Sequence, residues 1–164
     1  MKRIIPTLAL IPLLILSSCQ QKAPDDYSDE IEVIKKITDA LVYTGHEELF
    51  DEAYADTAKL YWNSVHALSP KEALRGMELA LEHFTDMRFL EGKVYETVTT
   101  AEGQTWIGFW GVWEGRVKEH STVVQLPVHL ISRFENGKIV EESGFWDNQH
   151  LNDALAHPDS PEHE

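Results

Sequence analysis

The stretch TWIGFWGVW, at residues 105–113, limits the possible folds more than any other part of the sequence. Side chains of an extended strand point alternately to opposite faces of a sheet. The large residues therefore divide between two faces, with Trp106 and Trp110 on one and Ile107, Phe109 and Trp113 on the other. A strand that is apolar on both faces needs cover on both sides. We expect it to lie centrally in a sheet, with helices on one side and another subunit as a candidate cover for the other. The glycines at 108 and 111 leave room for bulky neighbours or a bend.

Further strands are predicted before and after this stretch. Residues 88–100 form one predicted strand, and residues 121–135 and 138–147 form a predicted hairpin around Asn136-Gly137. Asn-Gly favours a two-residue turn because both positions accept a positive φ. A three-residue loop that includes Glu135 and a glycine bulge fits the same sequence.

Helices are predicted ahead of these strands. Residues 31–41 carry isoleucine and leucine at helical spacing, and a short second helix fits HEELFDEAY at 46–54, followed by a strand at 58–64. Ser69-Pro70-Lys71-Glu72 is typical of a capping box at the start of a third helix. One face of that helix carries Leu74, Met77, Leu81 and Phe84. Helices followed by antiparallel strands indicate an α+β fold, in which one sheet buries a face against the helices.

The first eighteen residues are predicted to be a secretory signal peptide. Lys2 and Arg3 precede an apolar run at 4–16, which is too short for a transmembrane helix of roughly 20 residues. The run ends in Leu-Ser-Ser-Cys, which resembles the lipobox of bacterial lipoproteins. That resemblance implies cleavage before Cys19, lipid on this cysteine, and a membrane anchor. Because Cys19 is the only cysteine, disulfides and thiolate chemistry are excluded after lipidation.

The mature chain has the size of one domain, which we place at residues 29–156. Residues 19–28 are polar and are expected to form a flexible tether, and residues 157–164 a disordered tail. Gln20 after the cysteine resembles the sorting signal of outer-membrane lipoproteins, which predicts a position facing the periplasm. Removal of the signal takes away two basic and no acidic residues, so the net charge falls from -14 to -16. Such a charge argues against nucleic acid as a partner.

The end of the sequence carries a resemblance to a known family. VHLISRFENGKIVEESGFWDNQHL is similar to the C-terminal part of the SnoaL-like proteins of the nuclear transport factor two-like superfamily. The resemblance implies an α+β cone, with N-terminal helices on a strongly curved, mainly antiparallel sheet around a cavity, and it implies a homodimer. Asp147 follows Gly137 by ten residues, at the position of the acid/base aspartate of polyketide cyclases, and His129 matches a pocket histidine. Where the family often has Trp and Asp, this chain has Ser143 and Gly144.

These matches give the candidate site residues. The candidate catalytic residues are Asp147 and His129, since a carboxyl group buried among aromatic residues has a pKa suited to proton transfer near neutral pH. The candidate ligand-binding residues are Tyr61, Trp62, His66, Trp106, Trp110 and Phe145. The eight histidines show no zinc-helix spacing, and no glycine-rich phosphate loop or nucleophile elbow occurs. We therefore predict no metal and no cofactor.

The hairpin register decides whether the two candidate catalytic residues can meet. A two-residue turn puts His129 and Asp147 on opposite faces, whereas the three-residue loop puts them on one face. The two-residue turn also gives the cleaner core face, made of Val128, Leu130, Phe134, Ile139 and Phe145. A bulge at Pro127 would change the parity again.

Each candidate also has a structural interpretation. Asp147 is a favoured residue type for the N-cap of a helix that starts near Asn148. His129 is equally explained as an interface histidine, and the tryptophans as core or dimer surface. Two hypotheses follow. The first is a cell-envelope module that binds a small apolar or amphipathic ligand in its cone or serves in assembly. The second is a cofactor-independent isomerase, cyclase or dehydratase with Asp147 as general base.

Overall fold

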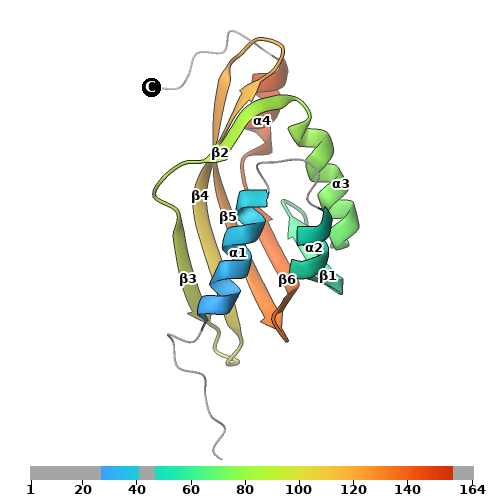
Figure 1. Ribbon diagram of the computed structural model, residues 1–164, viewed down its shortest axis with the longest axis vertical. Coiled ribbons are helices and arrows are strands. Elements are labelled where there is room, and N and C mark those ends of the chain that lie inside the picture. Colours follow the sequence, from blue (N-terminus) through green and yellow to red (C-terminus); the bar gives the residue numbers. More distant parts are fainter. Residues whose placement is uncertain (1–26, 41–46, 157–164) are drawn as a thin grey trace, which may run out of the picture.

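A computed structural model describes residues 27–40 and 47–156, in which four helices pack on a curved, open sheet (Figure 1). The predicted signal peptide at 1–18, Cys19 and the tail at 157–164 lie outside these residues. Across the described ranges, no helix has the length and apolarity needed to cross a bilayer.

The order of elements is that of an α+β fold, as the sequence predicts. The helices are α1 (Ser28–Ala40), α2 (Glu47–Ala53), α3 (Pro70–Leu81) and α4 (Asn148–Ala156). The strands are β1 (Tyr54–Trp62), β2 (Phe84–Phe89), β3 (Val94–Thr99), β4 (Thr105–Val117), β5 (Val123–Glu135) and β6 (Lys138–Phe145).

The sheet has the order β1-β6-β5-β4-β2. Strands β2 and β3 pair with successive parts of β4, β2 with residues 113–117 and β3 with residues 105–110. Only β1 runs parallel to its neighbour, β6, so the sheet is mainly antiparallel. The prediction of one strand at residues 88–100 is wrong. A turn with Gly92 at a φ of 90° separates β2 from β3, and the two strands pair with successive parts of β4.

Helix α3 begins as its sequence predicts. The Ser69 hydroxyl accepts a hydrogen bond from the Glu72 backbone N–H at 3.3 Å, and the Glu72 carboxylate accepts one from the Ser69 N–H at 2.8 Å. This capping box fixes the first turn of α3. The helix then places Ala73 and Leu74 in the core.

The two faces of β4 carry the side chains that its alternation predicts. Phe109 is 0% exposed beneath the helices, whereas Trp110 is 49% exposed on the opposite side of the sheet. We call the helix-covered side the inner face and the other side the outer face. Both glycines make room for neighbours: a Cβ at Gly111 would lie 2.5 Å from the Phe109 ring, and one at Gly108 would lie 2.8 Å from the Glu96 side chain.

The β5–β6 hairpin has the two-residue turn, with Asn136 and Gly137 both at positive φ. This turn sets the register of only the first two pairs. Phe134 pairs with Ile139, but Arg133 pairs with Glu141, so a bulge at Val140 shifts the rest of β6 by one residue. The β4–β5 register runs without a break through Pro127, so no bulge at that residue changes the parity there. The shift turns Phe145 away from the core, to 54% exposure on the outer face.

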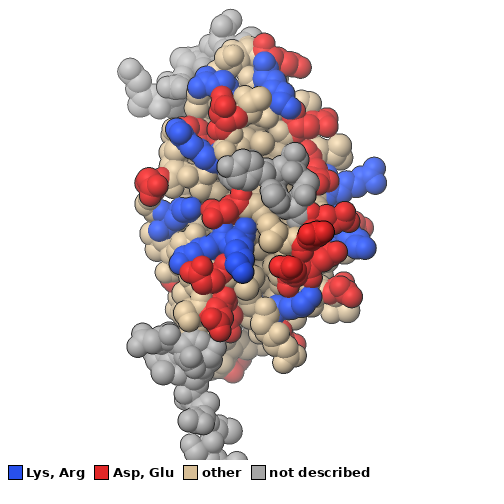
Figure 2. Space-filling view, viewed as in Figure 1, with Lys and Arg blue, Asp and Glu red and all other residues tan. Residues whose placement is uncertain are grey.

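Charged side chains of both signs are interspersed over the face in Figure 2, and acidic groups gather over α2. That helix contributes Glu47, Glu48, Asp51 and Glu52. No extended basic patch is visible on this face, in line with the acidic composition.

Candidate functional site

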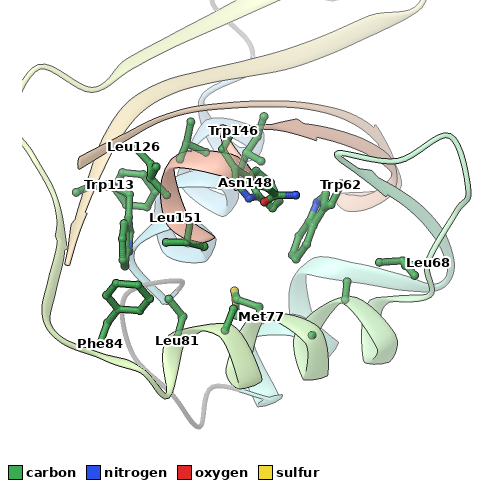
Figure 3. A pocket seen from close by; sticks show the side chains of 16 residues that line it. Trp62, Leu68, Met77, Leu81, Phe84, Trp113, Leu126, Trp146, Asn148 and Leu151 are labelled. Carbon is green, nitrogen blue, oxygen red and sulfur yellow. The ribbon is translucent and has the colours of Figure 1, made fainter. Parts of the chain in front are cut away.

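A cavity of about 330 Å³ lies between α3, α4 and the inner face of the sheet (Figure 3). We call it the inner cavity. Among the residues that the structure describes, sixteen line it, and none of these carries an ionisable side chain. The amide of Asn148, at the start of α4, is the most polar group among them. This described lining can hold an uncharged molecule but contains no group that would transfer a proton.

Four aromatic side chains form two opposite parts of the cavity wall. Trp62 and Trp146 meet edge to face, with ring centroids 5.9 Å apart and planes at 71°. Phe84 and Trp113 meet in the same way at 5.2 Å and 86°. Figure 3 shows Met77 and Leu81 of α3 below the space between these two pairs. Such edge-to-face pairs hold ring orientation as well as burying area.

Gly144 explains how the two tryptophans fit together. A Cβ atom at this position would lie 2.8 Å from Cδ1 of Trp62, 2.9 Å from Cζ3 of Trp146 and 3.0 Å from Cδ2 of Leu130. The absence of a side chain at Gly144 therefore lets the two indoles and Leu130 approach the backbone of β6 closely.

Asn63 holds Trp146 in place from the end of β1. Its side chain donates to the Trp146 carbonyl at 2.9 Å and accepts from the Trp146 N–H at 3.1 Å. Its own backbone N–H donates to the Gly144 carbonyl at 2.8 Å. Asn63 has a φ of 46°, a conformation that asparagine tolerates better than most residues.

A fully buried carboxyl group lies behind Trp62. Glu142 is 0% exposed and accepts three hydrogen bonds, from Tyr54, Trp62 and Ser132. Burial raises the pKa of Glu142 above its ordinary value, and the three hydrogen bonds oppose this shift. Burial and the neighbouring Glu142 raise the pKa of Tyr54 well above its usual value, so Tyr54 remains a neutral donor.

A second, more open groove of about 730 Å³ lies on the outer face. We call it the outer groove. Its floor is a cross-strand row in which Trp110 pairs with His129 and His129 with Phe145. The Trp110 and His129 rings stack at 3.7 Å and 13°, and the Trp110 N–H donates to Glu96 at 2.7 Å. Burial lowers the pKa of His129 from its ordinary value, and the Glu96 carboxylate opposes that shift.

Asp147 caps helix α4. Its Oδ1 accepts hydrogen bonds from the backbone N–H groups of Gln149 at 2.9 Å and His150 at 3.2 Å. The residue is exposed and borders the outer groove together with His129, so both candidate catalytic residues lie outside the inner cavity. The structural interpretation of Asp147 as an N-cap is the one that the geometry supports.

The predicted ligand-binding residues are divided among three places. Trp62 lines the inner cavity, whereas Trp110 and Phe145 line the outer groove. The other three border neither space. Tyr61 lies on the face of β1 opposite Trp62, Trp106 lies on the outer face of β4 beneath Arg133 at 6.0 Å, and His66 is exposed in the loop after β1. Aromatic residue type alone therefore does not separate cavity-lining residues from residues elsewhere on the sheet.

Several cavity residues were not among the predicted site residues. Trp113 and Trp146 belong to this group, as do Met77 and Leu81, which the sequence assigned to a core face of α3. The helical spacing of the latter two was the available signal, because one apolar face can serve both core and cavity. In the two described ranges, no three His, Cys, Asp or Glu side chains gather as metal ligands.

Comparison with known proteins identifies the fold. A candidate SnoaL-like polyketide cyclase from Jannaschia sp. CCS1 superposes with a TM-score of 0.62 at 16% identity, covering 81% of this chain and 94% of that chain. IdmH, a candidate polyketide cyclase from Streptomyces antibioticus, gives 0.60 at 17%, covering 77% and 97%. An NTF2-like protein from Anabaena variabilis ATCC 29413 gives 0.60 at 10%, covering 84% and 98%.

These similarities define the class of protein by its architecture. The chain has the SnoaL-like, NTF2-like fold that its C-terminal sequence resembles. No protein-family profile matches the sequence, and no curated protein matches it either. Because the fold hosts unrelated activities, the function has to be argued from the site.

Proposed function

We propose that this protein is a membrane-anchored binding module of the cell envelope that holds a small, neutral, apolar or amphipathic molecule in the inner cavity. One observation carries the proposal: in the described part of the chain, the sixteen residues that line the cavity include no ionisable side chain. An uncharged ligand loses no ionic solvation on entering such a site, whereas a charged ligand would remain unpaired. The volume of about 330 Å³ is at the small end of ligand pockets.

An isomerase, cyclase or dehydratase would need a different arrangement. General acid-base catalysis requires a titratable group within hydrogen-bond reach of the reacting atom. Asp147 instead caps α4, and His129 lies on the outer face. IdmH and the Jannaschia protein are both described as candidate polyketide cyclases. For this reason a cyclase or isomerase activity, with Asp147 as the general base, is our alternative proposal.

The anchor and the location are part of the same proposal. We propose lipidation at Cys19, a tether that ends before α1 begins at Ser28, and attachment to the outer membrane on its periplasmic side. The support is the signal-like start, the Leu-Ser-Ser-Cys ending and the position of the only cysteine. Several acyl chains would hold the domain stably, whereas one chain alone would bind only marginally.

We further propose that two copies associate through the outer face. The row across β3, β4, β5 and β6 contains Val94, Trp110, His129 and Phe145, and three of these are about half exposed. The described helices cover only the inner face, so a second copy would supply the cover that a two-sided apolar strand needs.

Native mass spectrometry of the chain beginning at Gln20, purified gently from a bacterial host, tests the proposal. We expect a dimer that retains a reproducible extra mass, which is lost on denaturation. A species without ligand that also fails to bind the neutral fluorescent probe N-phenylnaphthylamine would contradict the binding role. If a substrate is found and Asp147→Asn slows its turnover on the order of 100-fold, the enzyme alternative replaces it.

A further inference from the structure

The carboxyl group of Glu142 joins the two strands that flank β6. Oε1 accepts from the Tyr54 hydroxyl at 3.0 Å and from the Trp62 indole N–H at 2.9 Å, both on β1. Oε2 accepts from the Ser132 hydroxyl on β5 at 2.7 Å. Three directed donors fix the position of both carboxyl oxygens.

Burying this group has a cost that ordinary core packing does not require. A carboxyl group removed from water destabilises a fold unless it is fully hydrogen-bonded, and an apolar residue of similar size often serves stability as well or better. Glu142 lies on the inner face among apolar neighbours such as Leu60 and Ile139. Its three partners satisfy it, but they do not explain why a carboxyl group occupies this position.

Trp62 supplies the explanation, because one end of its indole meets Glu142 and its ring lines the inner cavity. The same ring lies against Gly144, where a Cβ would be 2.8 Å from Cδ1, and against the edge of Trp146 at 5.9 Å. Figure 3 shows the ring projecting into the cavity from the side opposite Phe84 and Trp113. Of these three contacts, the hydrogen bond to Glu142 is the directional one, because it favours the side-chain rotamer that points the indole N–H at the carboxyl group, whereas the other two are steric.

We infer that Glu142 is a positioning residue of the inner cavity, which holds the indole of Trp62 as a rigid wall and thereby sets the shape of ligand that the cavity accepts. The inference rests on the proposed binding function, because it assigns Glu142 a role in that site. Glu142 itself does not line the cavity, so its effect on a ligand passes through Trp62.

Two variants of the same residue test the inference in the purified full chain. Glu142→Leu removes both acceptors, whereas Glu142→Gln keeps one for the Trp62 N–H and can donate to Ser132. Glu141→Leu is the matched control, since Glu141 is the preceding residue of β6 and pairs with Arg133 on the outer face. The readouts are the dissociation constant of N-phenylnaphthylamine and the hydrogen exchange of the Trp62 indole N–H, assigned by its loss in Trp62→Phe.

We expect Glu142→Leu to weaken probe binding about tenfold or more and to speed exchange of the Trp62 indole. Glu142→Gln should restore both to within about threefold of the parent, and Glu141→Leu should change neither. Unchanged affinity and unchanged indole exchange in a folded Glu142→Leu protein would overturn the inference.

If Glu142→Leu does not fold, two other variants test the inference. Ser132→Ala and Tyr54→Phe each remove one support of the carboxyl group without touching the cavity lining. The inference expects weaker probe binding and faster indole exchange in both, whereas a purely structural role would lower stability alone. If the parent protein binds no probe, the binding function fails, and the indole exchange still decides whether Glu142 fixes Trp62.

Discussion

Phe109 and Trp110 are neighbours in the sequence, yet they belong to two different parts of the molecule. Phe109 lies on the inner face, 0% exposed, between the rings of Phe89 at 5.2 Å and Tyr95 at 5.4 Å. Trp110 lies on the outer face, 49% exposed, stacked only on His129. The inner face is complete within one chain, whereas the outer face presents large rings without cover from the described helices. One strand thus contributes to the fold with one side, and its other side is the one that we propose for association.

The largest expected effect is on the inner face. Phe109→Ala should lower the free energy of unfolding by about 3–5 kcal/mol, because it removes a fully buried ring and leaves a cavity. Trp110→Ala should cost less than about 1 kcal/mol in the monomer, because half of its surface is already in water. Urea denaturation at low protein concentration measures both. An equal loss of unfolding free energy in the two variants would contradict the expected difference between the inner and outer faces.

The next largest effect is on association through the outer face. Trp110→Ala should raise the dissociation constant of the proposed dimer by about 30-fold or more, as a buried aromatic anchor does. Leu79→Ala is the control, since Leu79 is 55% exposed but lies on α3, away from the sheet. Sedimentation at a series of concentrations gives the constants. A dimer that tolerates Trp110→Ala but not Leu79→Ala would place the interface elsewhere.

A substitution at the cavity wall should have an intermediate effect. Gly144→Ala forces a methyl group against Trp62 and Trp146, so it should destabilise by about 1–3 kcal/mol and weaken binding of N-phenylnaphthylamine. Gly76→Ala is the matched control, because Gly76 also lines the cavity but a Cβ there meets nothing within 4 Å. In mid-helix that change should stabilise by about 0.5–1 kcal/mol. Denaturation and probe titration separate the two outcomes.

Local signals predicted the elements well because they act over few residues. The Ser69 capping box, the Asn136-Gly137 turn and the two-faced alternation of residues 105–113 all have the predicted form. The bulge at Val140 has no comparable local signal. A shift of one residue exchanges the faces of a strand, so this single feature moved Phe145 from the predicted core to the outer face.

The site was harder to predict because it depends on partners that are distant in the sequence. Glu142 stands between Glu141 and Ser143 on β6, polar surroundings that are typical of solvent-facing residues, whereas its partners Tyr54 and Ser132 lie on other strands. Tyr61 and Trp62 differ by one residue at the end of β1, and the parallel pairing with β6 decides which of them enters the cavity. Register and tertiary packing, rather than residue type, separate cavity from surface here.

The two faces should also respond oppositely to pH, and the inner face should respond more. The folded protein raises the pKa of Glu142 by burial, so the stability that the neutral carboxyl provides is present below the ordinary value of 4.5. That stability is lost as pH rises from 4.5 through the raised pKa, with a slope of at most about 1.4 kcal/mol per pH unit for one proton. Urea denaturation from pH 4 to 8 should show this decline in the parent and a weaker one in Glu142→Gln. Parallel curves would mean that Glu142 does not titrate in this range.

The smallest expected effect comes from His129 on the outer face. Burial against Trp110 lowers the pKa of His129, while Glu96 on the neighbouring strand opposes the shift and Glu91 and Asp147 face the same groove. An imidazole with a lowered pKa contributes stability above its ordinary value of 6.5 and loses it as pH falls through the folded pKa. Because the ring is only partly buried, the loss should stay below about 1 kcal/mol. His129→Phe keeps an aromatic ring against Trp110 but cannot titrate, so it should flatten the pH dependence of the free energy of unfolding between pH 7.5 and 5.5. An identical dependence in this variant would mean that titration of His129 does not cause the loss of stability on the outer face.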